Sequence, residues 1–219
     1  LGEYYTYGWA GVDPTNGNPL WYTDETKTKT TSKLNEANKF FQGKSAFPTY
    51  MAGLRSDMSY KNISLSVFFT GQFDYSVFDS WTGYTMNDGS YWYYNVHKEL
   101  LYDSWTPENP NASNPKQIYG NATNSRTGST RTIYKGDHIR LKEVKLAYSF
   151  GDKLIKSGID NLSIYLRGTN LATWVFDKKL KFDPESNSNA SSYAWQNKGV
   201  YDYTSPIMKS ISLGVSIDF

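Results

Sequence analysis

The chain has 219 residues, with 23 Lys and Arg against 21 Asp and Glu and no cysteine. A net charge of only +2 gives no electrostatic case for a nucleic-acid partner, and the lack of cysteine excludes disulfides and thiolate-bound metals. With two histidines and no metal-ligand spacing, we expect neither a metal nor a cofactor. The chain is 17% aromatic, which suits a sugar-binding surface or the wall of a β-barrel.

Alternation of apolar and polar residues with a period of two predicts β-strands along the chain. In chain order the expected strands cover 3–10, 50–60, 62–74, 139–150, 162–167 and 207–219. In the last of these, Leu213, Val215 and Ile217 alternate with small polar residues, so one face suits hydrocarbon and the other suits water. In 139–150 the alternation changes phase at Glu143/Val144, which predicts a β-bulge.

The connections between these strands have two lengths. Those at 60–62 and 151–160 are short, and those at 11–48, 75–137 and 176–205 are long. Short turns at one rim and long loops at the other are typical of outer-membrane barrels. The sequence therefore predicts an all-β fold, an antiparallel transmembrane β-barrel segment of about six strands with long extracellular loops. A short amphipathic helix is expected within the middle loop, at 94–105.

Five segments carry recognisable motifs. They are GVDPTNGNPLW at 11–21, WTPEN at 105–109, DHIRLKEVKLAYSF at 137–150, NLSIYLRGTNLATW at 161–174 and FDPE at 182–185. Together, and in this order, they resemble the C-terminal part of SusC/RagA-type TonB-dependent transporters.

The resemblance implies a nutrient importer of the Bacteroidota outer membrane and not an enzyme. Such a protein has an N-terminal plug inside a barrel of about 22 strands, is energised through TonB and is usually covered by a SusD-like surface lipoprotein. Its cargo is an oligosaccharide or an oligopeptide. Since no signal peptide, TonB-contacting segment or plug is recognisable, we expect residues 1–219 to be the C-terminal portion of the barrel, with TonB bound through the missing N-terminal region.

Two other classes of protein remain open. The first is a complete small outer-membrane barrel of about eight strands. The second is a secreted carbohydrate-binding β-sandwich, in which the apolar faces of the strands would form a core instead of facing outer-membrane lipid.

The candidate site consists of aromatic residues in the two later loops. Their rings could pack against sugar or peptide cargo, form an interface with the lipoprotein lid, or form the core of the loop itself. The candidates are Trp81, Tyr84, Tyr91, Trp92, Tyr93, Tyr94 and Trp105 in the middle loop, and Tyr193, Trp195, Tyr201 and Tyr203 in the last.

Other aromatic residues suit the barrel itself. Phe219, on the apolar face of the last strand, resembles the signal read by barrel-assembly machinery. Rings near strand ends are expected to form a girdle at headgroup level. These girdle residues are Trp9, Tyr50, Tyr60, Tyr148, Phe150 and Trp174.

Two groups of polar residues, a turn at 13–18 and a loosely basic region, are expected to have structural roles. The segment 13–18 has oxygen-bearing side chains around a glycine, yet it lacks the distal Glu of a calcium loop and is expected to be an ordinary turn. A loosely basic region is expected to line a solvated loop and the barrel lumen, with lipopolysaccharide contact as an alternative. Its members are Arg126, Arg131, Lys135, Arg140, Lys142 and Lys145.

Overall fold

The computed structural model describes residues 2–150, 161–186 and 198–218, which form two compact units. The first, here named the loop unit, contains 2–47, 76–134 and 198–204. The second, named the sheet unit, contains the remaining described residues.

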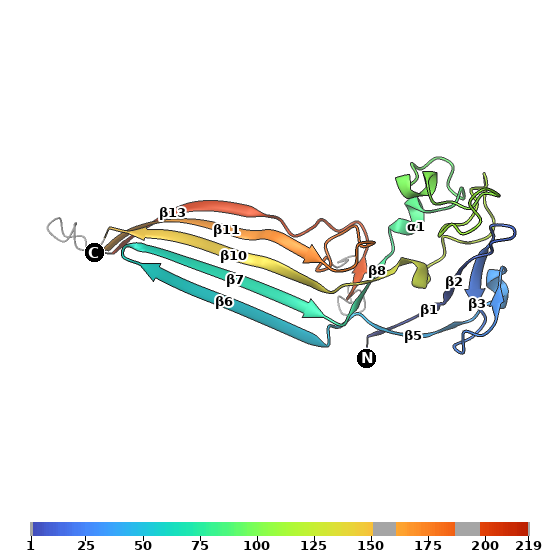
Figure 1. The fold of residues 1–219 in the computed structure, drawn as a ribbon, viewed down its shortest axis with the longest axis horizontal. Helices are drawn as coiled ribbons and strands as arrows, with labels where there is room; N and C mark the ends of the chain where they lie inside the picture. The colour runs from blue at the N-terminus through green and yellow to red at the C-terminus, as the bar shows by residue number, and fades with distance from the viewer. Residues whose placement is uncertain (1, 151–160, 187–197, 219) are drawn as a thin grey trace. The chain divides into compact units, whose positions relative to one another are not determined.

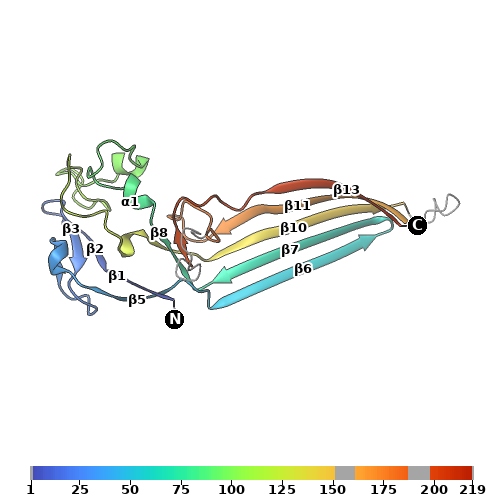
Figure 2. The same cartoon turned by 180° about the vertical axis from the view of Figure 1, so that it is seen from behind.

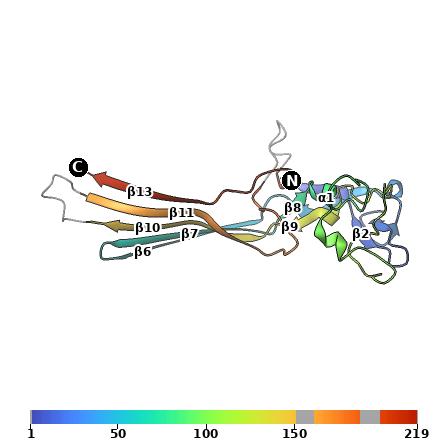
Figure 3. The same cartoon turned by 90° about the horizontal axis from the view of Figure 1, so that it is seen from above.

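The sheet unit is built on five long antiparallel strands. They are β6 (Tyr50–Tyr60), β7 (Ile63–Phe73), β10 (His138–Ser149), β11 (Asn161–Val175) and β13 (Ser210–Asp218). Their order in the sheet is β13-β11-β10-β7-β6, so each long strand pairs with the next one along the chain (Figures 1 and 3). The arrows in Figure 2 alternate in direction, as expected for an up-and-down wall.

The register of the sheet collects apolar side chains on one face. One row crosses all five strands and consists of Met58, Leu65, Leu146, Leu166 and Leu213. Leu213 is 73% exposed and Leu146, on the central strand, is 47% exposed. A continuous and largely exposed apolar row of this kind is unfavourable in water and suits contact with hydrocarbon.

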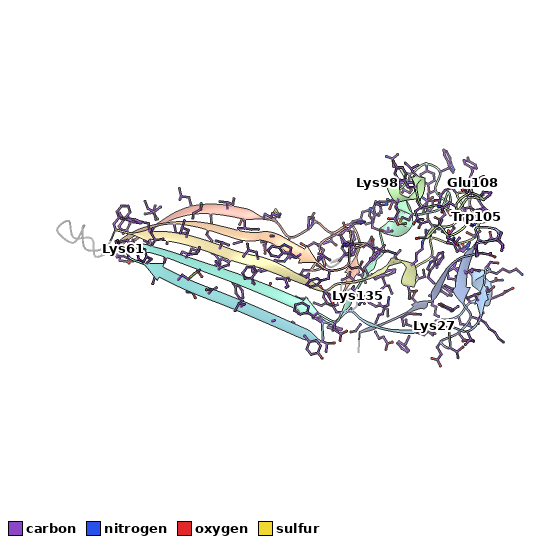
Figure 4. The ribbon with its side chains drawn as sticks, in the orientation of Figure 1. Lys27, Lys61, Lys98, Trp105, Glu108 and Lys135 are labelled. Carbon is purple, nitrogen blue, oxygen red and sulfur yellow. The ribbon has the colours of Figure 1, made fainter. Side chains whose placement is uncertain are left out.

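The opposite face carries charges and hydroxyl groups. The neighbouring row contains Asp57, Ser66, Lys145, Arg167 and Ser212. Figure 4 shows side chains projecting from both faces of the strands. The sheet therefore has one oily and one wet face, as the alternation in the sequence predicts.

The short turn predicted at 60–62 is confirmed. Strands β6 and β7 are joined by Lys61 and Asn62, with Lys61 at a φ of +55° (Figure 4). The two connections at the opposite end of these strands, 74–137 and 176–209, are much longer. This asymmetry matches the expected pattern of turns and loops in an outer-membrane barrel.

The predicted bulge is also confirmed. The register of β10 shifts between Leu141 and Glu143 against both of its neighbours. In β11 the same site contains Asn170 at a φ of +52°, a left-handed conformation that asparagine tolerates better than most residues. Its Nδ2 donates to the carbonyl of Met208 at 3.1 Å, so the bulge is tied to the segment that enters β13.

The loop unit consists of short strands around its own core. The strands are β1 (Glu3–Tyr7) with β5 (Lys39–Ser45), then β2 (Trp9–Val12), β3 (Pro19–Tyr22) and β4 (Thr30–Thr31), and finally β12 (Val200–Tyr201), β8 (Ser76–Asp79) and β9 (Ile133–Lys135). The helical elements are α1 (Thr82–Thr85) and three 3-10 turns, Leu34–Glu36, Lys98–Leu101 and Thr130–Thr132. The most buried apolar residues include Trp21, Phe40, Val77, Leu100 and Ile133.

Three sequence expectations are corrected here. The long sheet has five described strands and not six, because the stretch 3–10 divides between β1 and β2, which pair with β5 and β3. Trp9 is therefore not a girdle residue of the sheet; its ring lies 5.9 Å from that of Trp21, at 85°. The helix expected at 94–105 is only the 3-10 turn Lys98–Leu101, of which Leu100 alone is buried.

We expect Leu146→Arg to hinder assembly of the folded protein in the outer membrane. An arginine on the lipid face near the bilayer midplane costs about 2–4 kcal/mol. Folded and unfolded fractions can be measured by heat-modifiable mobility on gels. Ala147→Arg, on the opposite face of the same strand, is the matched control, and equal losses for both variants would contradict the assignment of the faces.

Candidate ligand-contact site

Eight of the described aromatic residues of the loop unit form one ring cluster. Tyr84 lies at the centre, 5.7 Å from Tyr91 with nearly parallel rings and 6.0 Å from Tyr94 with perpendicular rings. Trp81 lies 4.0 Å from Tyr203, which comes from the last loop. The cluster consists of Trp81, Tyr84, Tyr91, Trp92, Tyr93, Tyr94, Tyr119 and Tyr203. The fold thus brings together candidates that are more than 100 residues apart in sequence.

One side of this cluster is open. Trp92 is 65% exposed and lies 6.0 Å from Tyr119, which is itself exposed. Tyr93 and Tyr94 are also exposed, whereas Tyr84 and Tyr91 are half-buried. The half-buried rings support the exposed ones, so the cluster serves both as loop core and as an accessible surface. Tyr119 was missed in the sequence because it stands apart from the other aromatic residues of the loop, between Ile118 and Gly120.

A buried ion pair positions the loop that carries these rings. Asp88 is fully buried at a φ of +52°, and its carboxylate accepts two hydrogen bonds from Arg131, at 2.6 and 3.1 Å. Arg131 also donates to Asn114 at 2.9 Å. Arg131 was expected to be a solvated basic residue, and this is wrong: the carboxylate of Asp88 neutralises it inside the loop unit.

Trp105 belongs to a different part of the loop unit. Its Nε1 donates to the carbonyl of Pro14 at 3.0 Å, and its ring covers Gly17, where a Cβ would clash. The WTPEN and GVDPTNG motifs therefore pack against each other. The turn at 13–18 is ordinary, as predicted, since Asp13 Oδ1 accepts from the backbone of Thr15 at 2.9 Å.

The remaining candidates are placed as follows. Tyr201 is half-buried in β12, where it pairs in parallel with Asp79 of β8. Tyr193, Trp195 and Phe219 lie outside the described residues, so their expected roles stay predictions.

The RLK and DPE motifs meet in the sheet unit. Arg140 is almost completely buried; its Nη2 lies 2.5 Å from Asp183 Oδ1 and its Nε lies 3.0 Å from Glu185 Oε2. His138 Nε2 lies 3.4 Å from Glu185 Oε1, and Lys142 lies 3.9 Å from the same carboxylate. The expectation that Arg140 is solvated is therefore wrong, because the DPE segment returns to cover it.

Electrostatics stabilises the ionised form of this carboxylate. The hydrogen bond from the His138 imidazole, together with the charges of Arg140 and Lys142, holds the pKa of Glu185 below its usual range against the opposing effect of burial. The ion pairs between the RLK and DPE motifs thus hold the segment that follows β11 against the first residues of β10.

The wet face of the sheet contains a hollow of about 850 Å³. Its lining includes Arg55, Asp57, Lys145, Tyr165 and Arg167. Arg167 is paired with Glu143, and the ammonium of Lys145 lies 4.6 Å from the centre of the Tyr165 ring. This face is polar in the manner of a barrel lumen.

Two searches of the described residues returned nothing. No helix there is both long and apolar enough to cross a bilayer. The same residues contain no group of three His, Asp or Glu side chains that could hold a metal ion.

The chain is similar to known outer-membrane proteins. It is 32% identical to TonB-dependent receptor P26 of Formosa agariphila over 178 residues, which are 80% of this chain and 17% of that protein. It superposes on the RagAB peptide transporter with a TM-score of 0.80 at 25% identity, covering 99% of this chain and 23% of that one. The superposition on the RagAB peptide importer in its "open-open" state has a TM-score of 0.82 at 25% identity and covers 99% of this chain and 22% of that one. For the "closed-closed" state the TM-score is 0.79 at 26% identity, with 99% of this chain and 23% of that one covered. No family model matches.

The two-faced antiparallel sheet with long loops at one end defines a segment of an outer-membrane β-barrel. More particularly, the chain is a SusC/RagA-like segment of a TonB-dependent receptor, which confirms the resemblance found in the sequence. It spans less than a quarter of the length of the relatives described above.

We expect Asp88→Asn to loosen the ring cluster. The substitution leaves Arg131 buried without its counter-charge, and breaking such a pair costs about 3–5 kcal/mol. Limited proteolysis of the full-length protein should cut within 81–94 at least about tenfold faster. Glu25→Gln, at an exposed position of the same unit, should leave the rate unchanged. Equal cleavage rates in Asp88→Asn and the wild type would contradict the positioning role.

We expect Glu185 to contribute acid-sensitive stability. Because its pKa is lowered in the folded state, the contribution is full above the ordinary carboxylate pKa and is lost as the pH falls through the lowered value. Urea unfolding of the full-length protein between neutral and acidic pH should show this loss, and Glu185→Gln should be destabilised at neutral pH with a flatter dependence. The exposed Glu108→Gln is the control (Figure 4). An unchanged pH profile in Glu185→Gln would refute the contribution.

Proposed function

We propose that the protein containing this segment is a TonB-dependent transporter that imports oligosaccharides or oligopeptides across the outer membrane. A SusD-like surface lipoprotein covers its extracellular side, and TonB supplies energy through a part of the protein outside this segment. The role is transport and not catalysis. The similarity to a TonB-dependent receptor and to the RagAB peptide transporter supports this proposal.

The observation that carries the proposal is the sheet with one oily and one wet face and two open edges. Among the described residues, the outer edges of β6 and β13 have no strand partner. Open edges are not tolerated in hydrocarbon, where each backbone group needs a partner within the protein. We therefore propose that residues 1–219 form the C-terminal portion of a larger barrel whose other strands and plug lie elsewhere in the protein.

The two alternative classes fit these observations less well. A β-sandwich requires Leu213, Val215 and Ile217 in a core, but these residues are 73%, 57% and 46% exposed. A complete small barrel needs further spanning strands, and the remaining described strands have two to seven residues, too short to cross a bilayer.

The exposed rings at Trp92 and Tyr93 are proposed to contact the cargo or the lid. Open aromatic rings bind the apolar faces of sugars, and they also dominate the centres of protein interfaces. The half-buried members of the cluster hold these rings in place. The hollow on the wet face of the sheet would then form part of the lumen that the cargo crosses.

The test uses the full-length transporter in its native host, with and without TonB. Labelled oligosaccharides and oligopeptides of matched size should accumulate only when TonB is present. The double variant Trp92→Ala/Tyr93→Ala should reduce either cargo affinity or co-purification of the lipoprotein by about tenfold, or about 1.4 kcal/mol. Tyr102→Ala, an exposed tyrosine that makes no ring contact among the described residues, is the control. Uptake that does not depend on TonB would refute the transport proposal, and a variant that changes neither quantity would remove the site from it.

A further inference from the structure

Arg126 lies beside the ring cluster and is free of any acidic partner among the described residues. Its guanidinium carbon lies 4.4 Å from the centre of the Tyr91 ring. The side chain is exposed, and no described carboxylate lies within ion-pairing distance of it. A cation in this position has hydrogen-bond donors available for a ligand.

The comparison with Arg131 shows what distinguishes this arginine. Both guanidinium groups lie over aromatic rings, Arg131 at 5.0 Å from that of Trp9. Arg131 is buried and uses its donors on Asp88, Asn114 and the carbonyl of Ser125. Arg126 has the same chemistry at the surface without such partners among the described residues.

The backbone around Arg126 is fixed on both sides. Thr127 donates to the carbonyl of Asn124 at 2.9 Å, which closes a turn with Arg126 at its third position. The preceding residue, Ser125, is buried, and its carbonyl accepts from Arg131 at 3.3 Å. The carbonyl of Arg126 itself lies against Gly83 of α1, where an added Cβ would stand only 3.1 Å away. The turn therefore presents the side chain from a defined position next to the rings.

We propose that Arg126 and the ring cluster form a subsite for an acidic sugar unit, one that bears a carboxylate or a sulfate. The inference rests on the proposed transport function and specifies its cargo as an acidic oligosaccharide. A guanidinium donates two parallel hydrogen bonds to either anionic group. Tyr93 and Tyr94 lie 5.7 and 5.6 Å from the Tyr91 ring, so the cation and the open rings are close enough to contact one pyranose and its substituent.

A peptide with acidic side chains is the competing ligand. Peptide recognition commonly uses an exposed strand edge or pockets for alternate side chains. The candidate site instead offers open rings, and residues with hydroxyl or amide side chains adjoin its members in the sequence: Ser90, Asn95, Asn124 and Thr127. This surface matches the hydroxyl groups and the C–H faces of a sugar better than it matches a peptide.

The test measures binding to the purified full-length transporter by isothermal titration calorimetry. The probes are a trigalacturonate, a sulfated galactose trisaccharide, a neutral galactose trisaccharide and a glutamate-containing tripeptide. The variants are Arg126→Gln, Arg126→Lys and, as a matched control, Lys98→Gln, an exposed lysine of the same unit (Figure 4).

We expect the acidic sugars to bind about tenfold tighter than the neutral one, with the preference falling as salt is added. Arg126→Gln should remove this preference without changing neutral-sugar binding, Arg126→Lys should keep part of it, and Lys98→Gln should change nothing. The two acidic probes separate carboxylate from sulfate.

Several outcomes overturn the inference. The inference is wrong if acidic and neutral sugars bind with equal affinity, or if Arg126→Gln and Lys98→Gln have equal effects. It is also wrong if the peptide binds more tightly than any sugar. In those cases TonB-dependent uptake would still support the proposed function. If no sugar probe binds, the inference fails, and the uptake assay decides the proposed function separately.

Discussion

Backbone hydrogen bonding in a medium without water is the constraint on which this structure depends. Five long strands pair side by side, and the row from Met58 to Leu213 places apolar side chains on one face. In water such a face would be covered by a second layer, as in a β-sandwich. In a bilayer it is covered by acyl chains, and the opposite face is left for charged and hydroxyl groups around a wet hollow.

The family motifs acquire a physical meaning once the fold is seen. RLK and DPE lie more than 40 residues apart, yet Arg140, Asp183 and Glu185 form one buried ionic cluster. The Asn-Leu motif lies at a bulge, where Asn170 takes a left-handed conformation and bonds to the chain entering β13. Both motifs thus fix the places where long connections join the sheet.

The loop unit uses the same device for a different purpose. Asp88 and Arg131 form a buried pair that holds a loop in place, and that loop displays aromatic rings to solvent. Rigid support beneath open rings lowers the entropy lost when a ligand or a partner binds. Arg126, presented on a fixed turn at the edge of the rings, adds a charge that the loop unit itself does not neutralise among its described residues.

The sequence by itself determined where the strands of the sheet lie, their two faces, the turn at 60–62 and the bulge near Glu143, because alternation and turn chemistry are local properties of the chain. It predicted one strand at 162–167, whereas β11 covers Asn161–Val175, because the alternation is interrupted at the bulge. It also identified most of the rings of the cluster, since Tyr84 and Tyr91–Tyr94 are close together in the chain. Only the tertiary structure decided that the stretch 3–10 leaves the long sheet, that Arg131 and Arg140 are buried, and that Tyr203 and Tyr119 join the rings. These facts depend on pairing partners distant in sequence, and neither the period of an alternation nor the charge of a residue encodes which distant segment will cover it.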